Sequence, residues 1–409
     1  MATGERGGRP HPERTGPDTR LLLATLLTQV SASLPIFLLG ALAVEVRKDL
    51  KFDESGLGLA VALYFVSISL TAGAAGRLAD RIGWRQAAFI ALTGSTCTLV
   101  AVPLLGRNYG SLLVLLLIGG GATAIAFPAT NLALSGGALT RRHVRLFVVK
   151  QLSLPLTAFV AGAAVPTIAL HIGWRWAFVA GAILPALGVL AVRGADRSPG
   201  VGGRSGADRR APPVRILSVP LLGMAVASLF GISGIAVLNA FLVSSSVDGG
   251  MSPGSAGALV SVANVVAFAA MFGAGFLVDR DTRRVFTVIA ALLAGAAAGF
   301  SLLASGRQSL FIAGAILAYS AGWAWTGLFQ FSVVLSHSHA PASASGVTET
   351  GLAVGAAAGP LLFGLVAEQI SYDVAWAATA GSAVVAAGLM LLAGWRLGLK
   401  GLPRLEASV

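Results

Sequence analysis

Long apolar stretches separated by short charged connectors repeat along the whole of this 409-residue chain. Each stretch has about 18 to 25 residues, the length that an α-helix needs to cross a bilayer. Backbone N–H and C=O groups find no water inside lipid, and the stretches are too long for barrel strands, so we expect helices. The predicted spans are residues 21–44, 57–76, 86–106, 110–136, 146–170, 174–193, 216–243, 256–276, 285–305, 309–335, 343–367 and 373–395.

The composition excludes a soluble protein of this size. Hydrophobic residues make up 56% of the chain and charged residues only 11%, with a mean hydropathy of +0.81, whereas soluble domains have about 25% charged residues. The outer surface is therefore expected to face lipid. Residues 1–20 are polar and have no apolar core of a signal peptide, so we expect a disordered cytoplasmic tail.

The basic residues predict the orientation of the spans. The net charge is +12, but the Lys and Arg residues lie in connectors between apolar runs, which argues against a nucleic-acid partner. With the N-terminus inside, only six lie on the opposite side, namely Arg47, Lys48, Lys51, Arg107, Arg175 and Arg307. Cytoplasmic loops carry the excess of Lys and Arg, so we predict a multi-pass protein of the bacterial inner membrane with both termini cytoplasmic.

The longest polar connector divides the spans into six and six. We expect a six-helix bundle at 21–193, a flexible cytoplasmic linker at 194–215, a second bundle at 216–396 and a cytoplasmic tail at 397–409. The halves align with an offset of about 199 residues, which brings Asn131 onto Gln330 and, one residue shorter, Gln151 onto Glu349. An even number of spans in each half makes the repeat parallel, related by an axis along the membrane normal.

A charged motif recurs at the same place in both halves. It reads Gly76-Arg77-Leu78-Ala79-Asp80-Arg81-Ile82-Gly83-Trp84-Arg85 in the first half and Gly275-Phe-Leu-Val-Asp279-Arg280-Asp-Thr-Arg283-Arg284 in the second. Together with twelve spans and Gly173-Trp-Arg-Trp-Ala-Phe178 before span six, it resembles the signature loop of the major facilitator superfamily. The resemblance implies an all-α membrane fold of two pseudo-symmetric six-helix bundles, usually a monomer, that exposes a central site alternately to either side.

Physical chemistry suggests a role for the motif as a cytoplasmic gate. Gly76 would let two helices approach closely. Asp80, Arg81 and Arg85, with Asp279, Arg280 and Arg284 in the second copy, could form ion pairs in one orientation of the halves and lose them in the other. The alternative is that these are only positive-inside charges on a tight turn.

Two ionisable groups lie inside predicted spans and away from their first and last residues, where charge is costly and therefore suggests function. Glu349 lies in span eleven before the small-residue run Gly351 to Gly359, which would permit close packing and rocking, and could carry a proton. Lys150 begins span five and could hold an anion opposite Glu349. The alternatives are a structural hydrogen bond for Glu349 and a Lys150 side chain that extends to the headgroups.

Uncharged polar side chains near mid-membrane complete the candidate site. They are Gln29, Asn131, Gln151, Asn239, Asn264 and Gln330, to which we add Trp325 as an aromatic lining residue. Amides orient solutes, but they also join helices at about 0.6 kcal/mol each, which is the simpler interpretation for any one of them.

The sequence favours secondary active transport of a small solute, with protons as a second partner. It has no phosphate-binding loop for ATP, and Lys150-Gln151-x-Ser153-x-Pro155 resembles the fifth span of cyanate-permease-like carriers, which favours an anion. Drug or metabolite efflux is the alternative, and a membrane sensor or enzyme a weaker one. The lone Cys97 and five scattered histidines suggest no metal, no cofactor and no catalytic residues.

Overall fold

The computed structural model describes residues 19–134, 150–195, 218–280, 284–337 and 341–397. The predicted tails and the central linker lie almost entirely outside these ranges. The described residues form helices and turns without strands, and twelve of the helical segments are long and apolar enough to cross a membrane. The predicted all-helical, twelve-span architecture is confirmed.

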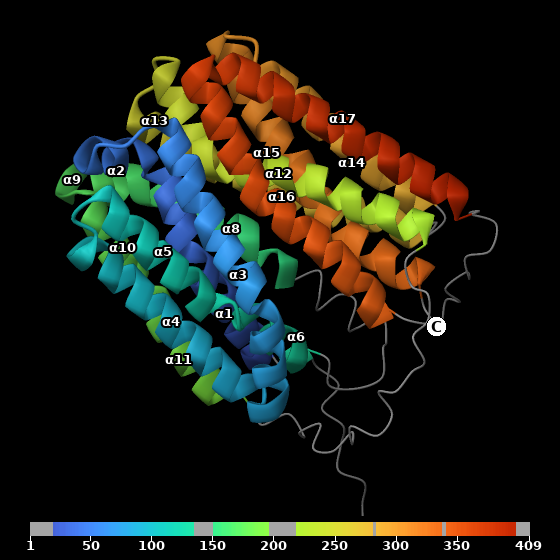
Figure 1. Ribbon diagram of the computed structural model, residues 1–409, viewed down its shortest axis with the longest axis horizontal. Coiled ribbons are helices and arrows are strands. Elements are labelled where there is room, and N and C mark those ends of the chain that lie inside the picture. The colour runs from blue at the N-terminus through green and yellow to red at the C-terminus, as the bar shows by residue number, and fades with distance from the viewer. Residues whose placement is uncertain (1–18, 135–149, 196–217, 281–283, 338–340, 398–409) are drawn as a thin grey trace, which may run out of the picture.

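The N-terminal half is coloured blue to green in Figure 1 and the C-terminal half yellow to red. The N-terminal half contains α1 (Thr19–Ala41), α2 (Ala43–Leu50), α3 (Glu54–Ile82), α4 (Trp84–Leu105), α5 (Tyr109–Thr123), α6 (Ala126–Leu134), α8 (Ser153–Ala164), the π-helical turn η1 (Val165–Ala169), α9 (Leu170–Ile172), α10 (Trp174–Gly181) and α11 (Ile183–Gly194). The C-terminal half contains α12 (Val219–Asp248), α13 (Pro253–Arg280), α14 (Val285–Leu303), α15 (Gln308–Ser336), α16 (Pro341–Gln369) and α17 (Tyr372–Arg396).

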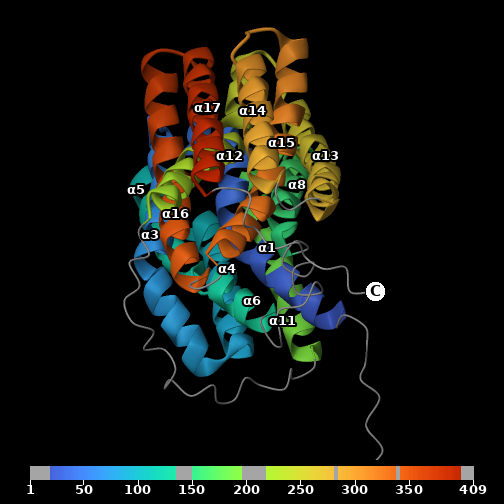
Figure 2. The same ribbon diagram turned by 90° about the vertical axis from the view of Figure 1, so that its right-hand side faces the viewer.

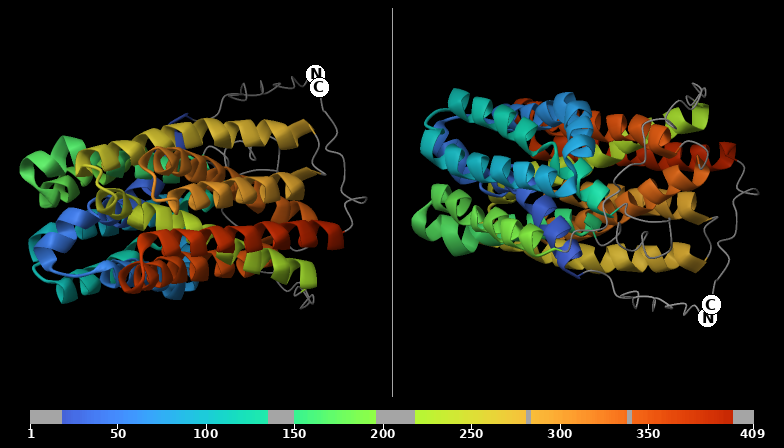
Figure 3. Two further views of the ribbon diagram at one scale, coloured as in Figure 1. Left: turned by 90° about the horizontal axis from the view of Figure 1, so that it is seen from above. Right: turned by 90° about the horizontal axis from the view of Figure 1, so that it is seen from below.

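The helices run lengthwise through the molecule, so the chain turns at two opposite ends (Figure 3). At one end α1 begins, α11 ends, α12 begins and α17 ends. We call this the linker end, because the linker between the halves starts and finishes there. The opposite end, where α3, α13 and α17 begin, is called the far end. Figure 2 shows α14, α15 and α17 of the C-terminal half at its top and α4, α6 and α11 of the N-terminal half at its bottom, while α16 lies beside α3.

The charged motif is mostly helical rather than a loop. The second span was predicted to end at residue 76, but α3 continues through Ile82. It stops at Gly83, whose φ of 81° suits a residue without a Cβ. Gly83 then starts α4 directly, so the turn between the two spans is a single residue.

Glycines bring neighbouring helices of the C-terminal half into contact. Gly351, Gly355 and Gly359 repeat at every fourth position of α16 and face α12. A Cβ on Gly355 would lie 2.1 Å from the carbonyl oxygen of Leu229. Lipid tails are as apolar as side chains, so close packing of this kind drives helix association in membranes. The small-residue run expected to permit rocking therefore packs within one half in this structure.

The halves meet mainly toward the far end, where α3 packs on α16, α8 on α13 and α1 on α12. Three glycines allow these crossings. A Cβ on Gly40 would lie 1.9 Å from Asn239 O, one on Gly58 2.4 Å from Pro360 O, and one on Gly257 2.7 Å from Gly162 O. Gly58 and Gly257 are 199 residues apart, so the same crossing occurs twice in the molecule.

Candidate transport site

Lys150 is buried in the N-terminal half with two partners. Its side chain is only 3% exposed. The Nζ atom donates a hydrogen bond to Oδ1 of Asn131 on α6 and lies 4.9 Å from the ring centroid of Phe127 on the same helix. An amide oxygen and a ring face both stabilise an ammonium group. Because it has these partners inside the bundle, Lys150 does not simply extend to the headgroups.

Glu349 has an amide partner in the C-terminal half. The Nε2 atom of Gln330 on α15 donates to its Oε1 at 2.7 Å. The Glu349 side chain is exposed to solvent although many protein atoms surround it. A carboxylate in a solvent-filled recess of the protein would have these properties.

The two pairs occupy equivalent positions. Asn131 and Lys150 are 19 residues apart, as are Gln330 and Glu349, and an offset of 199 carries the first pair onto the second. Each half therefore holds one charged side chain by an amide on the preceding helix. By hydrogen-bond partner Lys150 is the counterpart of Glu349, whereas the alignment that is one residue shorter and brings Gln151 onto Glu349 stays a prediction.

The two charges are opposite in sign and attract each other across the boundary between the halves. A lone charge at the centre of a span costs about 2.5–3.5 kcal/mol on insertion scales, so two opposite charges that face each other reduce the cost of both. Glu349 is exposed, and the far end is packed closed. Glu349 is therefore the accessible member of the pair, whereas Lys150 is buried.

Three of the other predicted amides join helices within one half. Gln29 on α1 accepts a hydrogen bond from Thr130 on α6 at 3.4 Å. Asn239 on α12 accepts from Tyr319 on α15 at 3.3 Å, and Asn264 on α13 accepts from Trp323 on α15 at 3.1 Å. Their geometry fits the helix-joining interpretation.

The remaining candidates are Trp325 and Gln151. Trp325 is 1% exposed and packs edge-on against Phe329, and its indole N–H has no hydrogen-bond partner in the structure. Gln151 is half-buried next to Lys150. Among the described residues neither side chain forms a hydrogen bond to Lys150 or Glu349, so a place for them in the site stays a prediction.

The predicted cytoplasmic gate stays a prediction, but the surroundings of its two glycines are visible. A Cβ on Gly76 or on Gly275 would meet no atom of the described residues within 4 Å. Arg85 donates to the carbonyl oxygens of Ala195 at 3.0 Å and Arg193 at 3.2 Å, which caps the end of α11 inside the N-terminal half. The glycine contacts described above between the halves lie toward the far end instead.

The other gate residues give less information. Asp80, Arg81 and Arg284 are exposed at the linker end. The side chains of Asp279 and Arg280 lie outside the described part of the structure, although both residues belong to α13.

Comparison with known proteins supports the fold and the family. The family model described as "Major Facilitator Superfamily" matches residues 21–348. The chain belongs to the major facilitator superfamily. No curated protein sequence matches it at significant similarity.

Solved structures of transporters share this superfamily fold. One is a bacterial homologue of the human lysosomal transporter Spinster, in an inward-facing and occupied conformation, with a TM-score of 0.72 and 15% identity over 96% of this chain and 100% of that one. Another is the nucleoside transporter NupG, with a TM-score of 0.67 and 17% identity over 91% of this chain and 99% of that one. Such low identities show the fold alone. Family and fold together support secondary transport of a small solute and point away from an enzyme.

Proposed function

We propose that this chain is a proton-coupled carrier of a small anion, acting as a monomer in a bacterial inner membrane. The observation that carries the proposal is the pair of equivalent, opposite charges, Lys150 and Glu349, one in each half. The excess of arginine at the linker end supports a cytoplasmic location for both termini. The structure would then correspond to a carrier open toward the cytoplasm.

Charge balance supports the coupling. With both groups ionised, Lys150 and Glu349 neutralise each other, and an anion that approaches Lys150 also meets the carboxylate. A proton on Glu349 removes this repulsion and leaves Lys150 in need of a counter-ion. An anion and a proton therefore favour each other's binding, and the site changes least in charge when both bind or both leave.

Transport in proteoliposomes tests the proposal. Radiolabelled small anions, such as formate, acetate, cyanate and nitrate, would be offered with an imposed pH gradient. We expect one or more of them to accumulate in wild type. Lys150→Gln should abolish uptake, and Glu349→Gln should permit exchange of the anion while losing accumulation driven by the pH gradient. Lys51→Gln and Asp373→Asn at the exposed far end are matched controls and should transport as wild type does.

The outcomes separate the alternatives. If Glu349→Gln still accumulates the anion along the pH gradient, proton coupling at this residue is contradicted. If Lys150→Gln still takes up the anion, Lys150 does not form the anion site. A zwitterionic solute carried with no dependence on the pH gradient would show instead that the pair binds both charges of its substrate directly.

A further inference from the structure

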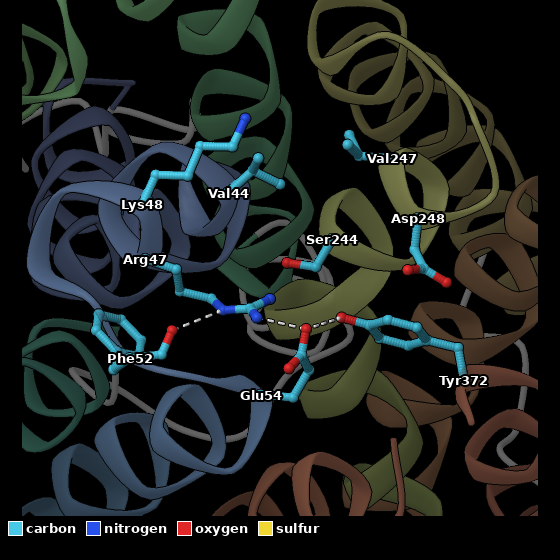
Figure 4. A pocket seen from close by; sticks show the side chains of 9 residues that line it. All are labelled: Val44, Arg47, Lys48, Phe52, Glu54, Ser244, Val247, Asp248 and Tyr372. Atoms are coloured by element: carbon cyan, nitrogen blue, oxygen red, sulfur yellow. Dashed lines mark hydrogen bonds and ion pairs between the residues drawn. The ribbon is translucent and has the colours of Figure 1, made fainter. Parts of the chain in front are cut away.

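A polar network joins the two halves at the far end, outside the candidate transport site. Glu54 begins α3 and accepts hydrogen bonds at Oε1 from Arg47 on α2 and from the Tyr372 hydroxyl at 3.1 Å. Tyr372 begins α17 in the other half. Figure 4 shows Arg47, Glu54 and Tyr372 in one row, joined by these bonds. Arg47 is further held by the carbonyl oxygen of Phe52 at 3.4 Å.

A second carboxylate crosses the same boundary. Glu368 on α16 accepts the backbone N–H of Ser55 at 3.0 Å through Oε2. The first N–H groups of a helix have no partner within the helix and favour negative charge nearby. Asp53 satisfies one of them in α3 by accepting from Gly56 N–H at 2.8 Å, and this bond holds the pKa of Asp53 below its usual value. The first turn of α3 is therefore capped from both halves at once.

The network has no counterpart at the equivalent helix crossing. The offset of 199 carries Glu54 to Pro253 and Ser55 to Gly254. The helices α10 and α17 begin after Gly173 and Ser371, an offset of 198, which carries Glu368 to Leu170 and Tyr372 to Trp174. Between α8 and α13 the Ser261 hydroxyl donates a hydrogen bond across the halves to the carbonyl oxygen of Phe159 at 3.0 Å. Packing of small residues suffices to close that crossing. The charged side chains between α3 and α16 are therefore not a requirement of the fold.

Water can reach the network. The Arg47 and Glu54 side chains are 19% and 20% exposed. They line a cavity of about 290 Å³ between the halves, to which Ser244 and Asp248 of α12 also contribute. Bonds at a wet boundary can exchange their partners for water, so they can break and form again as the halves move.

We propose that Glu54 and Glu368 form an outer gate. They fasten the first turn of α3 to α17 and α16 while the far end is closed, and their bonds to Tyr372 and Ser55 break each time the far end opens. Removing them shifts the resting protein toward the conformation that is open at the far end. Arg47 is a positioning residue in this gate, because it acts by holding the Glu54 carboxylate.

Distances between spin labels test the gate without any solute, so a failure here can be told apart from a failure of the proposed anion transport. In a Cys97→Ala background, one label pair at Arg107 and Asp373 reports the far end, and another at Arg193 and Arg396 reports the linker end. All four label positions are exposed and divided between the halves. Pulsed electron paramagnetic resonance gives each distance distribution in detergent and in nanodiscs.

We expect Glu54→Gln combined with Glu368→Gln to raise the population with a long far-end distance on the order of tenfold, since a neutral amide oxygen accepts these bonds less strongly than a carboxylate does. The linker-end distance should shorten in the same molecules. Tyr372→Phe alone should produce a smaller shift in the same direction. Opposite changes at the two ends indicate a change of access, which a general loss of packing does not produce.

The matched control is Asp49→Asn. Asp49 lies at the same end and accepts from the Trp174 indole at 3.0 Å and from Arg175, but all three residues belong to the N-terminal half. This variant should leave both distance distributions as in wild type. Unchanged distances in the Glu54 and Glu368 variant, lengthening at both ends, or an equal shift in Asp49→Asn would each overturn the proposal.

Discussion

Several polar side chains in this protein have a partner on another helix. Lys150 shows this most clearly, because a buried ammonium needs both a hydrogen-bond acceptor and a nearby negative charge. It obtains the acceptor from Asn131 in its own half and the charge from Glu349 in the other half. The contact of Lys150 with Asn131 lies within the N-terminal bundle, whereas its attraction to Glu349 depends on how the two halves are placed relative to each other.

Replacing Asn131 by leucine should lower stability, because the buried Lys150 ammonium then loses its acceptor. A buried donor left without a partner costs about 1–3 kcal/mol, so we expect a drop of several degrees in the melting temperature measured in detergent. The double variant Asn131→Leu with Lys150→Met should recover most of the loss, since both polar groups are then gone. A double variant no more stable than the single one would argue against this pairing.

Glu45 on α2 lies outside the membrane spans, and its burial predicts that the stability of the protein depends on pH. Its Oε2 atom is buried without a hydrogen-bond partner, and burial raises the pKa of Glu45 above its usual value. The folded state therefore binds the proton more tightly than the unfolded state, and the stability from this group is lost as pH rises through the folded pKa. Glu45→Gln should raise the melting temperature at pH 7.5 and leave it unchanged at pH 4. A gain of equal size at both pH values would point to packing instead.

Helix crossings depend on glycines at positions that differ in what surrounds them. Gly58 on α3 and Gly257 on α13 lie where helices of opposite halves touch, whereas Gly388 on α17 has no atom within 4 Å of where its Cβ would be. The same residue type is therefore required at the boundary and replaceable on the outer surface.

Gly58→Leu should prevent full closure of the far end, because its side chain would enter the space occupied by the Pro360 carbonyl. Overpacking costs about 1–3 kcal/mol, enough to shift the balance between conformations by roughly tenfold or more. The far-end spin-label distance defined above should lengthen. Gly388→Leu is the control and should leave that distance unchanged. A normal far-end distance in Gly58→Leu would mean that the helices shift locally without separating.

The whole molecule is a repeated bundle in which the two copies carry different chemistry at equivalent positions. The charged residue after the amide helix is Lys150 in one half and Glu349 in the other. Likewise, charged side chains join the halves at α3 and α16 and not at α8 and α13. The repeat gives both halves the same arrangement of helices. The residues that differ between the copies give the site two opposite charges and place charged contacts at one crossing of the halves.

Exchanging the charges tests this relation between the halves. Lys150→Glu alone and Glu349→Lys alone place like charges opposite each other and should reduce the yield of folded protein. The double exchange restores a neutral pair with an amide beside each group, so stability should return toward that of wild type. Size-exclusion profiles and melting temperatures of wild type, the two single variants and the double variant show how far the effect of one substitution depends on the other. Additive losses in the double exchange would show that the two residues do not interact.

The amino-acid sequence by itself determined the twelve spans, because the length and apolar character of a span are local properties. It also determined the two halves and their offset, because matching residues recur at a fixed spacing. It also identified Lys150, Glu349, Asn131 and Gln330, since ionisable and amide groups inside apolar runs stand out. Only the tertiary structure decided which of these meet, that Gln29, Asn239 and Asn264 join helices instead, and that the halves close at the far end. Those facts depend on contacts between residues distant in the chain, and in particular on the relative placement of the two bundles, which the spacing of residues along the sequence does not specify.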